Sequence, residues 1–131
     1  MKTLGFTGTR RGMTPLQKEE FKGFLYDYKP AEFHHGDCVG ADAEAHELVR
    51  RMFPKCHIII HPCDIEAQRA HCSGDLILPV RPPLARNRNI VNTCAQMFAA
   101  PGTKHETTRS GTWATVRYST FYKVPLILAL P

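Results

Sequence analysis

The sequence predicts an α/β protein: one domain in which a mainly parallel β-sheet of about five strands lies between two layers of helices. Three observations lead to this prediction. Short apolar segments alternate with segments whose apolar residues recur at helical spacing, which is typical of β-α-β units. Glycine-bounded loops follow several of the apolar segments. The 131 residues, 43% hydrophobic and 22% charged, are enough for a single core, so we expect one domain over residues 1–131.

Five short segments are predicted to be strands. The first carries Leu4 and Phe6, and the second has a weaker pattern. The third is apolar without a break, as expected for a strand that is buried on both faces of a sheet. The expected strands are residues 2–7, 32–35, 56–60, 96–100 and 124–130.

Four helices are predicted between these strands. The first begins with a capping box, in which Thr14 is the N-cap, Pro15 the first helical residue and Gln17 the third. The residues expected on its buried side are Leu16, Phe21, Phe24 and Leu25. The expected helices are residues 15–28, 41–53, 84–94 and 111–122.

Residues 61–83 show no clear pattern. Four prolines interrupt them, so we expect an irregular loop with one helical turn. The stretch contains four side chains that commonly bind metals: His61, Cys63, His71 and Cys72. Because their spacing matches no familiar structural zinc pattern, we predict no metal site.

The glycine-bounded loops are expected to meet at one edge of the sheet. In a parallel sheet between helices, ligands bind at the carboxyl ends of the strands, near the point where the strand order reverses. Residues 8–13, residues 36–42 and the loop before residue 111 each follow a strand, so they belong at that edge. These loops are rich in Gly, Thr and Arg, which suits an anion. The sequence therefore predicts a Rossmann-like domain with an anionic ligand.

The segment Arg109-Ser110-Gly111-Thr112, at the start of the last helix, is the candidate phosphate site. Gly111 lets backbone N–H groups converge, and Ser110 and Thr112 add hydroxyl groups. The helix N-terminus and Arg109 add positive charge. In the alternative interpretation, Ser110 is the ordinary N-cap of a buried helix.

Charge and composition limit the function classes. The net charge of +5 fits an anionic ligand and also fits weak nucleic-acid binding. No apolar run approaches the ~20 residues that a membrane span needs, and the N-terminus lacks the apolar core of a signal peptide. The five cysteines form no Cys-x-x-Cys pair, which favours reduced thiols. We therefore expect a cytoplasmic protein.

Four motifs resemble those of the SLOG superfamily of Rossmann-like proteins. They are Gly8-Thr9-Arg10, His35-Gly36-x-Cys38-x-Gly40-Ala41-Asp42, Arg86-Asn87-Arg88 and Arg109-Ser110-Gly111-Thr112. The superfamily includes the Smf/DNA-processing protein A family and the Lonely-Guy phosphoribohydrolases. The resemblance implies a small stand-alone member that binds a nucleotide or nucleotide-derived ligand and forms a homodimer or higher homo-oligomer. A single-stranded DNA-binding module, like the DNA-processing family, is an alternative.

The resemblance to the Lonely-Guy enzymes breaks at one position. These enzymes cleave the N-glycosidic bond of nucleoside 5′-monophosphates and use the Glu of a Pro-Gly-Gly-x-Gly-Thr-x-x-Glu motif. In this chain Thr115 stands where that Glu would be. A non-catalytic sensor of a nucleotide signal is therefore a second alternative, beside hydrolysis.

Two carboxylates are candidates for catalysis, because cleavage of a glycosidic bond needs a carboxylate to activate water or to stabilise a cationic ribose. Asp42 begins a helix, and Glu106 lies in the loop before the candidate phosphate site, from which it would swing in. Arg86 is expected to anchor phosphate. The expected ligand-binding residues are Gly8, Thr9, Arg10, Gly36, Gly40, Asp42, Arg86, Asn87, Arg109, Ser110, Gly111 and Thr112. No cofactor is expected.

Overall fold

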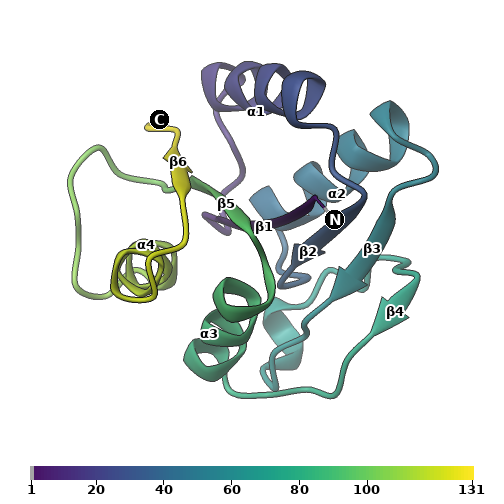
Figure 1. The fold of residues 1–131 in the computed structure, drawn as a ribbon. Coiled ribbons are helices and arrows are strands. Elements are labelled where there is room, and N and C mark those ends of the chain that lie inside the picture. The colour runs from purple at the N-terminus through teal and green to yellow at the C-terminus, as the bar shows by residue number, and fades with distance from the viewer. Residues whose placement is uncertain (1) are drawn as a thin grey trace.

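The computed structural model describes residues 2–131, which form one six-stranded sheet with helices on both faces (Figure 1). The strands are β1 (Thr3–Gly8), β2 (Glu32–His35), β3 (His57–Ile60), β4 (Leu76–Ile77), β5 (Gln96–Ala100) and β6 (Leu126–Leu128). The helices are α1 (Pro15–Tyr28), α2 (Ala41–Met52), α3 (Pro83–Thr93) and α4 (Gly111–Phe121). The predicted α/β fold is confirmed.

The strand order is β4-β3-β2-β1-β5-β6, and every pair of neighbouring strands is parallel. The chain moves outward from β1 to β4, crosses back to lie beside β1 as β5, and continues to β6 on the other side. This is the order of a Rossmann-like sheet, whose direction of winding reverses between β1 and β5. The carboxyl ends of these two strands, Gly8 and Ala100, are paired in register and mark that point.

The prediction of about five strands is too low by one. The additional strand, β4, has only two residues and lies within the stretch expected to be an irregular loop. It pairs with β3 through Ile59 with Leu76 and Ile60 with Ile77. A two-residue edge strand between proline-rich segments is too short to show an alternating pattern, so the sequence does not reveal it. The expected helical turn is present as a 3₁₀ turn over Glu66–Gln68.

The core lies on both faces of the sheet, which confirms the predicted three layers. On one face, α1 and α2 cover Phe6, Phe33 and Phe98, and Phe21 of α1 packs among them with ring centroids 4.9–6.1 Å away. On the other face, α3 and α4 pack against each other and against the sheet (Figure 1). The aromatic cluster packs α1 against the central strands of the sheet.

The capping box of α1 is present, but the buried side of this helix differs from the prediction. The Thr14 hydroxyl oxygen accepts a hydrogen bond from the Gln17 backbone amide, and the Thr14 backbone amide donates to the side-chain oxygen of Gln17. Leu16 is 58% exposed, whereas Gln17 is fully buried. The Gln17 side-chain amide donates to the carbonyls of Pro101 and Ala129, both at 2.8 Å. A buried glutamine is stable here because distant carbonyls satisfy it, and the helical pattern alone does not contain that information.

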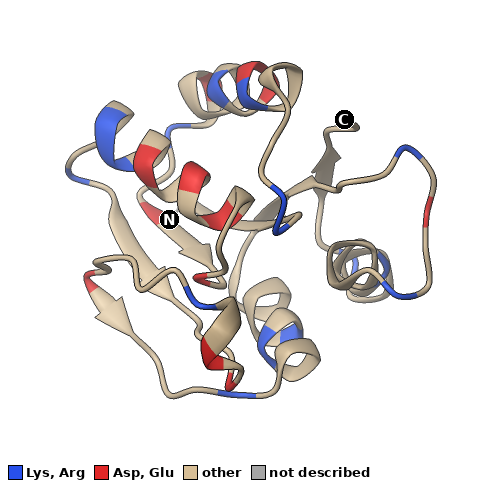
Figure 2. Ribbon diagram, turned by 180° about the vertical axis from the view of Figure 1, so that it is seen from behind, with Lys and Arg blue, Asp and Glu red and all other residues tan. Residues whose placement is uncertain are grey.

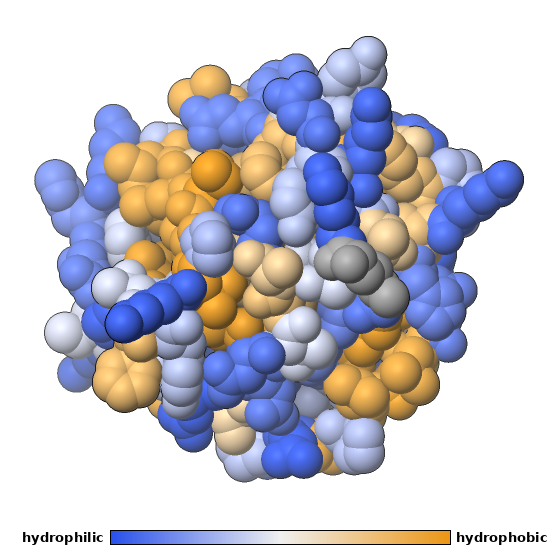
Figure 3. All heavy atoms as spheres, in the orientation of Figure 1, coloured by the Kyte–Doolittle hydropathy of each residue, from blue (hydrophilic) through white to orange (hydrophobic). Residues whose placement is uncertain are grey.

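Charged and apolar side chains are distributed unevenly over the surface. Figure 2 shows Lys and Arg on the loop between β1 and α1 and on the loop that leads from β5 into α4. Figure 3 shows apolar residues gathered over β6, at left, and near β4, at lower right, where Ile127 and Leu128 and also Leu76 and Ile77 are exposed. Within residues 2–131, the helices are too short or too polar to cross a membrane.

Candidate ligand-binding site

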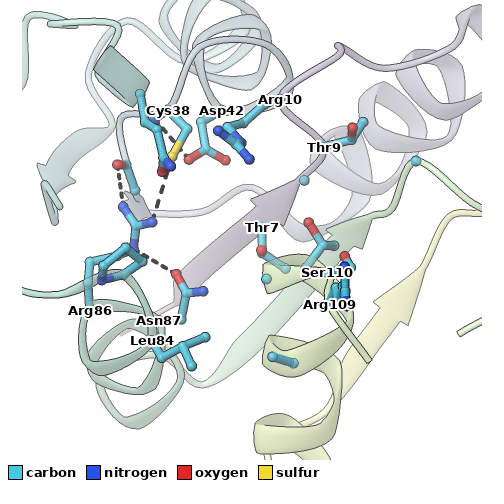
Figure 4. Close-up of a pocket in the computed structure, with 18 of the residues that line it drawn as sticks. Thr7, Thr9, Arg10, Cys38, Asp42, Leu84, Arg86, Asn87, Arg109 and Ser110 are labelled. Atoms are coloured by element: carbon cyan, nitrogen blue, oxygen red, sulfur yellow. Dashed lines mark hydrogen bonds between the residues drawn. The ribbon is translucent and has the colours of Figure 1, made fainter. Parts of the chain in front are cut away.

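A pocket of about 910 Å³ opens at the carboxyl edge of the sheet, where the winding reverses (Figure 4). The loops after β1, β2 and β5 line it, together with the first turns of α3 and α4. Its size falls within the range of about 300–1,000 Å³ that is usual for small-molecule sites. The loops that the sequence placed at this edge do meet there.

Eleven of the twelve residues expected to bind the ligand line this pocket. They are Gly8, Thr9, Arg10, Gly36, Asp42, Arg86, Asn87, Arg109, Ser110, Gly111 and Thr112. The twelfth, Gly40, does not line it. Gly40 has a φ of 91°, and a Cβ there would collide with the Arg10 backbone, so this glycine serves the turn between β2 and α2. Residues that sequence reasoning missed include Thr107 and Thr108, whose only signal was their place just before the candidate phosphate site.

The first turn of α4 presents open backbone amides to the pocket. The Ser110 hydroxyl oxygen accepts from the Trp113 amide at 3.2 Å, so Ser110 is the N-cap of the helix. The amides of Gly111 and Thr112 donate to no acceptor in residues 2–131. A Cβ on Gly111 would have only the Asn87 side-chain nitrogen nearby, at 3.7 Å. The two interpretations of this segment are therefore compatible: Ser110 caps the helix, and the helix start remains free for an anion.

Arg86 was expected to anchor a phosphate, but its side chain is held by hydrogen bonds inside the protein. It is 5% exposed, and its guanidinium donates to the carbonyls of Gly36, at 2.5 Å, and His61, at 3.1 Å. It also donates to the Asn87 side-chain oxygen at 2.6 Å and the Cys38 sulfur at 3.6 Å. These contacts tie the ends of β2 and β3 to α3. Arg86 is thus an internal brace between these elements. Because Arg86 donates to the side-chain oxygen of Asn87, the Asn87 NH₂ group is oriented with no acceptor among the described residues, and it can donate to a ligand.

Asp42 is a buried carboxylate at the inner end of the pocket. Its Oδ2 accepts from the Cys38 amide at 3.2 Å, whereas its Oδ1 has no hydrogen-bond partner in the described chain. Burial raises the pKa of Asp42 to about 6, although the nearby Arg86 charge acts in the opposite direction. An unpartnered acceptor in a buried position is costly unless a ligand satisfies it. Asp42 is therefore the strongest candidate contact at this end.

Neither Glu106 nor the residue at the Lonely-Guy glutamate position, Thr115, places a carboxylate in the pocket. Glu106 does not line the pocket; it forms an exposed ion pair with Arg117 at 2.6 Å. Thr115 is buried, and its hydroxyl donates to the Gly111 carbonyl at 2.9 Å. Asp42 is the sole carboxylate among the residues of the described chain that line the pocket.

Two arginines at the pocket are uncommitted. Arg10 and Arg109 are exposed and form no ion pair or side-chain hydrogen bond with other described residues. Arg11, by contrast, donates to the Gly102 carbonyl at 3.0 Å. In Figure 4, Arg10 and Asp42 are drawn on one side of the end of β1, and Arg109 and Ser110 on the other.

Buried histidines form two hydrogen-bonded pairs behind the pocket, which the sequence analysis did not foresee. His34 and His61 are 2.7 Å apart, and His35 and His46 are 2.9 Å apart, measured between ring nitrogens. His35, His46 and Cys72 lie close enough to hold a metal ion. However, the Asp37 amide donates to Nδ1 of His35, so Nε2 of His35 carries the proton and donates to His46. These hydrogen bonds occupy the lone pairs that a metal would need.

Three of the four side chains singled out in residues 61–83 have separate partners. His61 pairs with His34, and His71 pairs with Glu66 at 2.6 Å. Cys63 donates to the Ile65 carbonyl. Among the described residues, the candidate metal-ligand group includes only one of the four, Cys72, together with His35 and His46.

No protein-family model matches this chain, and no curated protein sequence matches it. The solved structures that are similar to it include the following two. The molybdenum cofactor binding protein from the phototrophic bacterium Rippkaea orientalis has a TM-score of 0.75 at 16% identity, over 99% of this chain and 77% of that protein. TM1055, a structural genomics target, has a TM-score of 0.68 at 13% identity, over 96% of this chain and 72% of that protein. At these identities the similarity shows the fold. The fold is Rossmann-like.

Proposed function

We propose that this chain binds a nucleotide or nucleotide-derived ligand in the pocket at the carboxyl edge of the sheet. The ligand's phosphate would lie on the open amides of Gly111 and Thr112, beside Arg109. A hydroxyl group of its sugar would donate to Oδ1 of Asp42. The observation that carries this proposal is the presence, in one pocket, of a free helix N-terminus and an unpartnered buried carboxylate oxygen.

The two ends of the pocket suit the two chemical parts of a nucleotide. The α4 end offers backbone donors and positive charge, which stabilise a phosphate without a deep cavity. The inner end offers an acceptor at Asp42 and a donor at the Asn87 amide, which bind neutral polar groups. A ligand with both parts satisfies both ends.

Membership of the SLOG superfamily is part of this proposal. The Rossmann-like fold and the presence of residues from each of the four motifs in the lining of one pocket support it. One similar structure is named a molybdenum cofactor binding protein, which is consistent with a small-molecule ligand for this fold. The molybdenum cofactor therefore joins the nucleoside monophosphates in the set of ligands to be tested.

Hydrolysis of an N-glycosidic bond is the second candidate function, and Asp42 is the observation that favours it. A carboxyl group with a pKa raised to about 6 is suited to accept a proton from water or to stabilise a cationic ribose. Glu106 would first have to leave Arg117 to reach the pocket. We therefore assign any catalytic role to Asp42 rather than Glu106.

Proton and phosphorus NMR with a panel of nucleoside monophosphates and the molybdenum cofactor tests the proposal. Line broadening or shifts of the ligand signals would show binding, and new free-base signals would show hydrolysis. The matched variants are Gly111→Ala, which fills the helix start, and Arg88→Gln, on an exposed residue outside the pocket. Binding that is lost in the first variant and kept in the second supports the proposal. Binding of single-stranded DNA alone would contradict it.

The expected homo-oligomer also stays a proposal. The exposed apolar residues Ile127 and Leu128 on β6 and Phe121 on α4 support it, because such residues often mark an interface. Sedimentation velocity should give about twice the chain mass of 14.8 kDa for a dimer. A sedimenting mass equal to the chain mass would contradict it.

A further inference from the structure

The charges that line the pocket are strongly unequal. Five arginine side chains line it: Arg10, Arg11, Arg86, Arg109 and Arg117. The facing acidic groups are Asp42, which lies near the buried Arg86, and Glu106, which lies outside the lining and pairs with Arg117. The guanidinium charges of Arg10, Arg11 and Arg109 thus have no acidic partner within the described residues.

The two uncommitted arginines belong to different parts of the pocket. Arg10 is in the loop after β1, and Arg109 directly precedes the N-cap of α4. In Figure 4 they lie on opposite sides of the end of β1. An anion bound at the start of α4, beside Arg109, therefore leaves the charge of Arg10 without a partner. Asp42 is drawn on the same side as Arg10, and its buried Oδ1, which has no hydrogen-bond partner in the described chain, supports a ligand contact on that side as well.

We propose that the ligand carries two neighbouring anionic groups, as a nucleoside diphosphate or a diphosphate-linked compound does, rather than one. This inference rests on the proposed function and names the ligand class of the same pocket. One anionic group lies on the amides of Gly111 and Thr112, beside Arg109. The second lies across the end of β1 on the Arg10 guanidinium. The neutral part of the ligand then reaches Asp42.

The space at the end of β1 is compatible with this arrangement. Thr7 and Gly8 end the strand, and both line the pocket with Gly36 opposite. These residues are small, and a pocket of about 910 Å³ has room for a ligand larger than a nucleoside monophosphate. Guanidinium groups suit this role because they bind phosphate oxygens through two parallel hydrogen bonds.

Isothermal titration calorimetry with inorganic phosphate, inorganic pyrophosphate, and the mono- and diphosphates of adenosine and guanosine tests the inference. The proteins are wild type, Arg10→Gln and Arg88→Gln; both arginines are exposed, so both variants should fold. We expect pyrophosphate to bind about tenfold more tightly than phosphate to wild type, since a hydrogen-bonded charge pair contributes about that factor. Arg10→Gln should reduce this ratio to about one and change the affinity for phosphate less than twofold. Arg88→Gln should retain the ratio.

The other outcomes overturn the inference and separate it from the proposed function. The deciding quantity is the affinity for pyrophosphate divided by the affinity for phosphate. A ratio near one in wild type, or an equal ratio in wild type and Arg10→Gln, would show that Arg10 is not a second anion site. If the monophosphates bind as tightly as the diphosphates, the inference is wrong and the proposed function remains. If neither class of nucleotide nor the inorganic anions bind, both are wrong.

Discussion

The two ends of the pocket are built by different means. At the α4 end, consecutive residues supply everything: Ser110 caps the helix, and Gly111 and Thr112 offer their backbone amides. At the inner end, Asp42 depends on a buried brace in which Arg86 joins the ends of β2 and β3 to α3. The first end is local and exposed, whereas the second depends on the whole fold. Substitutions in the two structures that build these ends should therefore affect different properties: ligand affinity for Gly111 and Thr112 of α4, and stability for the Arg86 brace.

The largest difference between the two ends is expected in stability, from the substitution Arg86→Met. The substitution removes a buried charge that satisfies the carbonyls of Gly36 and His61, and it leaves Asp42 buried without its neighbouring cation. We expect the free energy of unfolding in urea to fall by about 3–5 kcal/mol. Arg88→Met on the same helix is the control, because Arg88 is exposed and its loss should cost about 0.5 kcal/mol or less. Equal unfolding free energies for the two variants would show that Arg86 is not a brace.

A second test is the loss of stability in acid, which should come from the inner end. Burial lowers the pKa of four histidines behind the pocket: His34, His35, His46 and His61. The folded protein therefore binds fewer protons than the unfolded chain, so their contribution is complete above pH 6.5 and is lost as the pH falls. For His61, whose pKa is lowered to about 3, the loss at pH 5 is about 2 kcal/mol.

Asp42 opposes this trend, because its pKa is raised to about 6 in the folded protein. Its protonation between pH 7 and pH 4 favours the folded state, by about 1 kcal/mol at pH 5. Urea unfolding at pH 7.5 and at pH 5.0 should still show lower stability in acid, since four histidines act against one carboxyl group. His61→Gln should make the difference smaller. Equal stability at the two pH values would contradict the buried histidine pairs.

A matched pair of glycine substitutions separates packing from binding. A Cβ at Gly8 would lie 2.5 Å from Cβ of Ala41, so Gly8→Ala should reduce the unfolding free energy by about 1–3 kcal/mol. A Cβ at Gly111 meets no atom closer than 3.7 Å, so Gly111→Ala should leave the stability unchanged or slightly higher. The same substitution should weaken phosphate binding about tenfold, because the methyl group covers the open amides. A destabilised Gly111→Ala protein with normal phosphate affinity would reverse the roles assigned here.

The smallest expected effect concerns the proton on Asp42. The ionised carboxylate accepts a hydrogen bond from the ligand more strongly than the protonated carboxyl group does, so affinity for a nucleoside monophosphate should fall about three- to tenfold as the pH drops through about 6. Methyl phosphate, a monoester that is too small to reach Asp42 from the α4 end and whose second ionisation lies near that of a nucleotide, provides the control for titration of the phosphate itself. In Asp42→Asn, the two ligands should show the same pH dependence. If they already do so in wild type, Asp42 does not contact the ligand.

The sequence predicted what short segments determine. The capping box at Thr14 and the glycine at the start of α4 are local signals, so both helix starts were found. The meeting of the loops at one edge followed from the parallel order of the strands, which is a rule of topology. Most of the residues expected to bind the ligand consequently line the pocket.

Contacts between distant residues could not be predicted in the same way. Arg86 and Asp42 were both expected at the site, but the carbonyls that bind Arg86 come from the ends of β2 and β3. The ion pair that holds Glu106 on Arg117 likewise depends on how the loop after β5 folds back on α4. Sequence patterns indicate which face of a helix or strand is buried and where a helix is capped. The partner of a buried polar group depends instead on how distant segments pack together.

The most direct test is a ¹H–¹⁵N NMR titration of the wild-type protein with inorganic phosphate and with nucleoside 5′-monophosphates. We expect phosphate to shift the amide signals of Gly111 and Thr112 and to leave those around Asp42 unchanged. A nucleotide should shift both groups of signals at the same concentrations. Shifts confined to residues outside the pocket, or a nucleotide that leaves the amides of Gly111 and Thr112 unchanged, would contradict a pocket with a phosphate end and a sugar end.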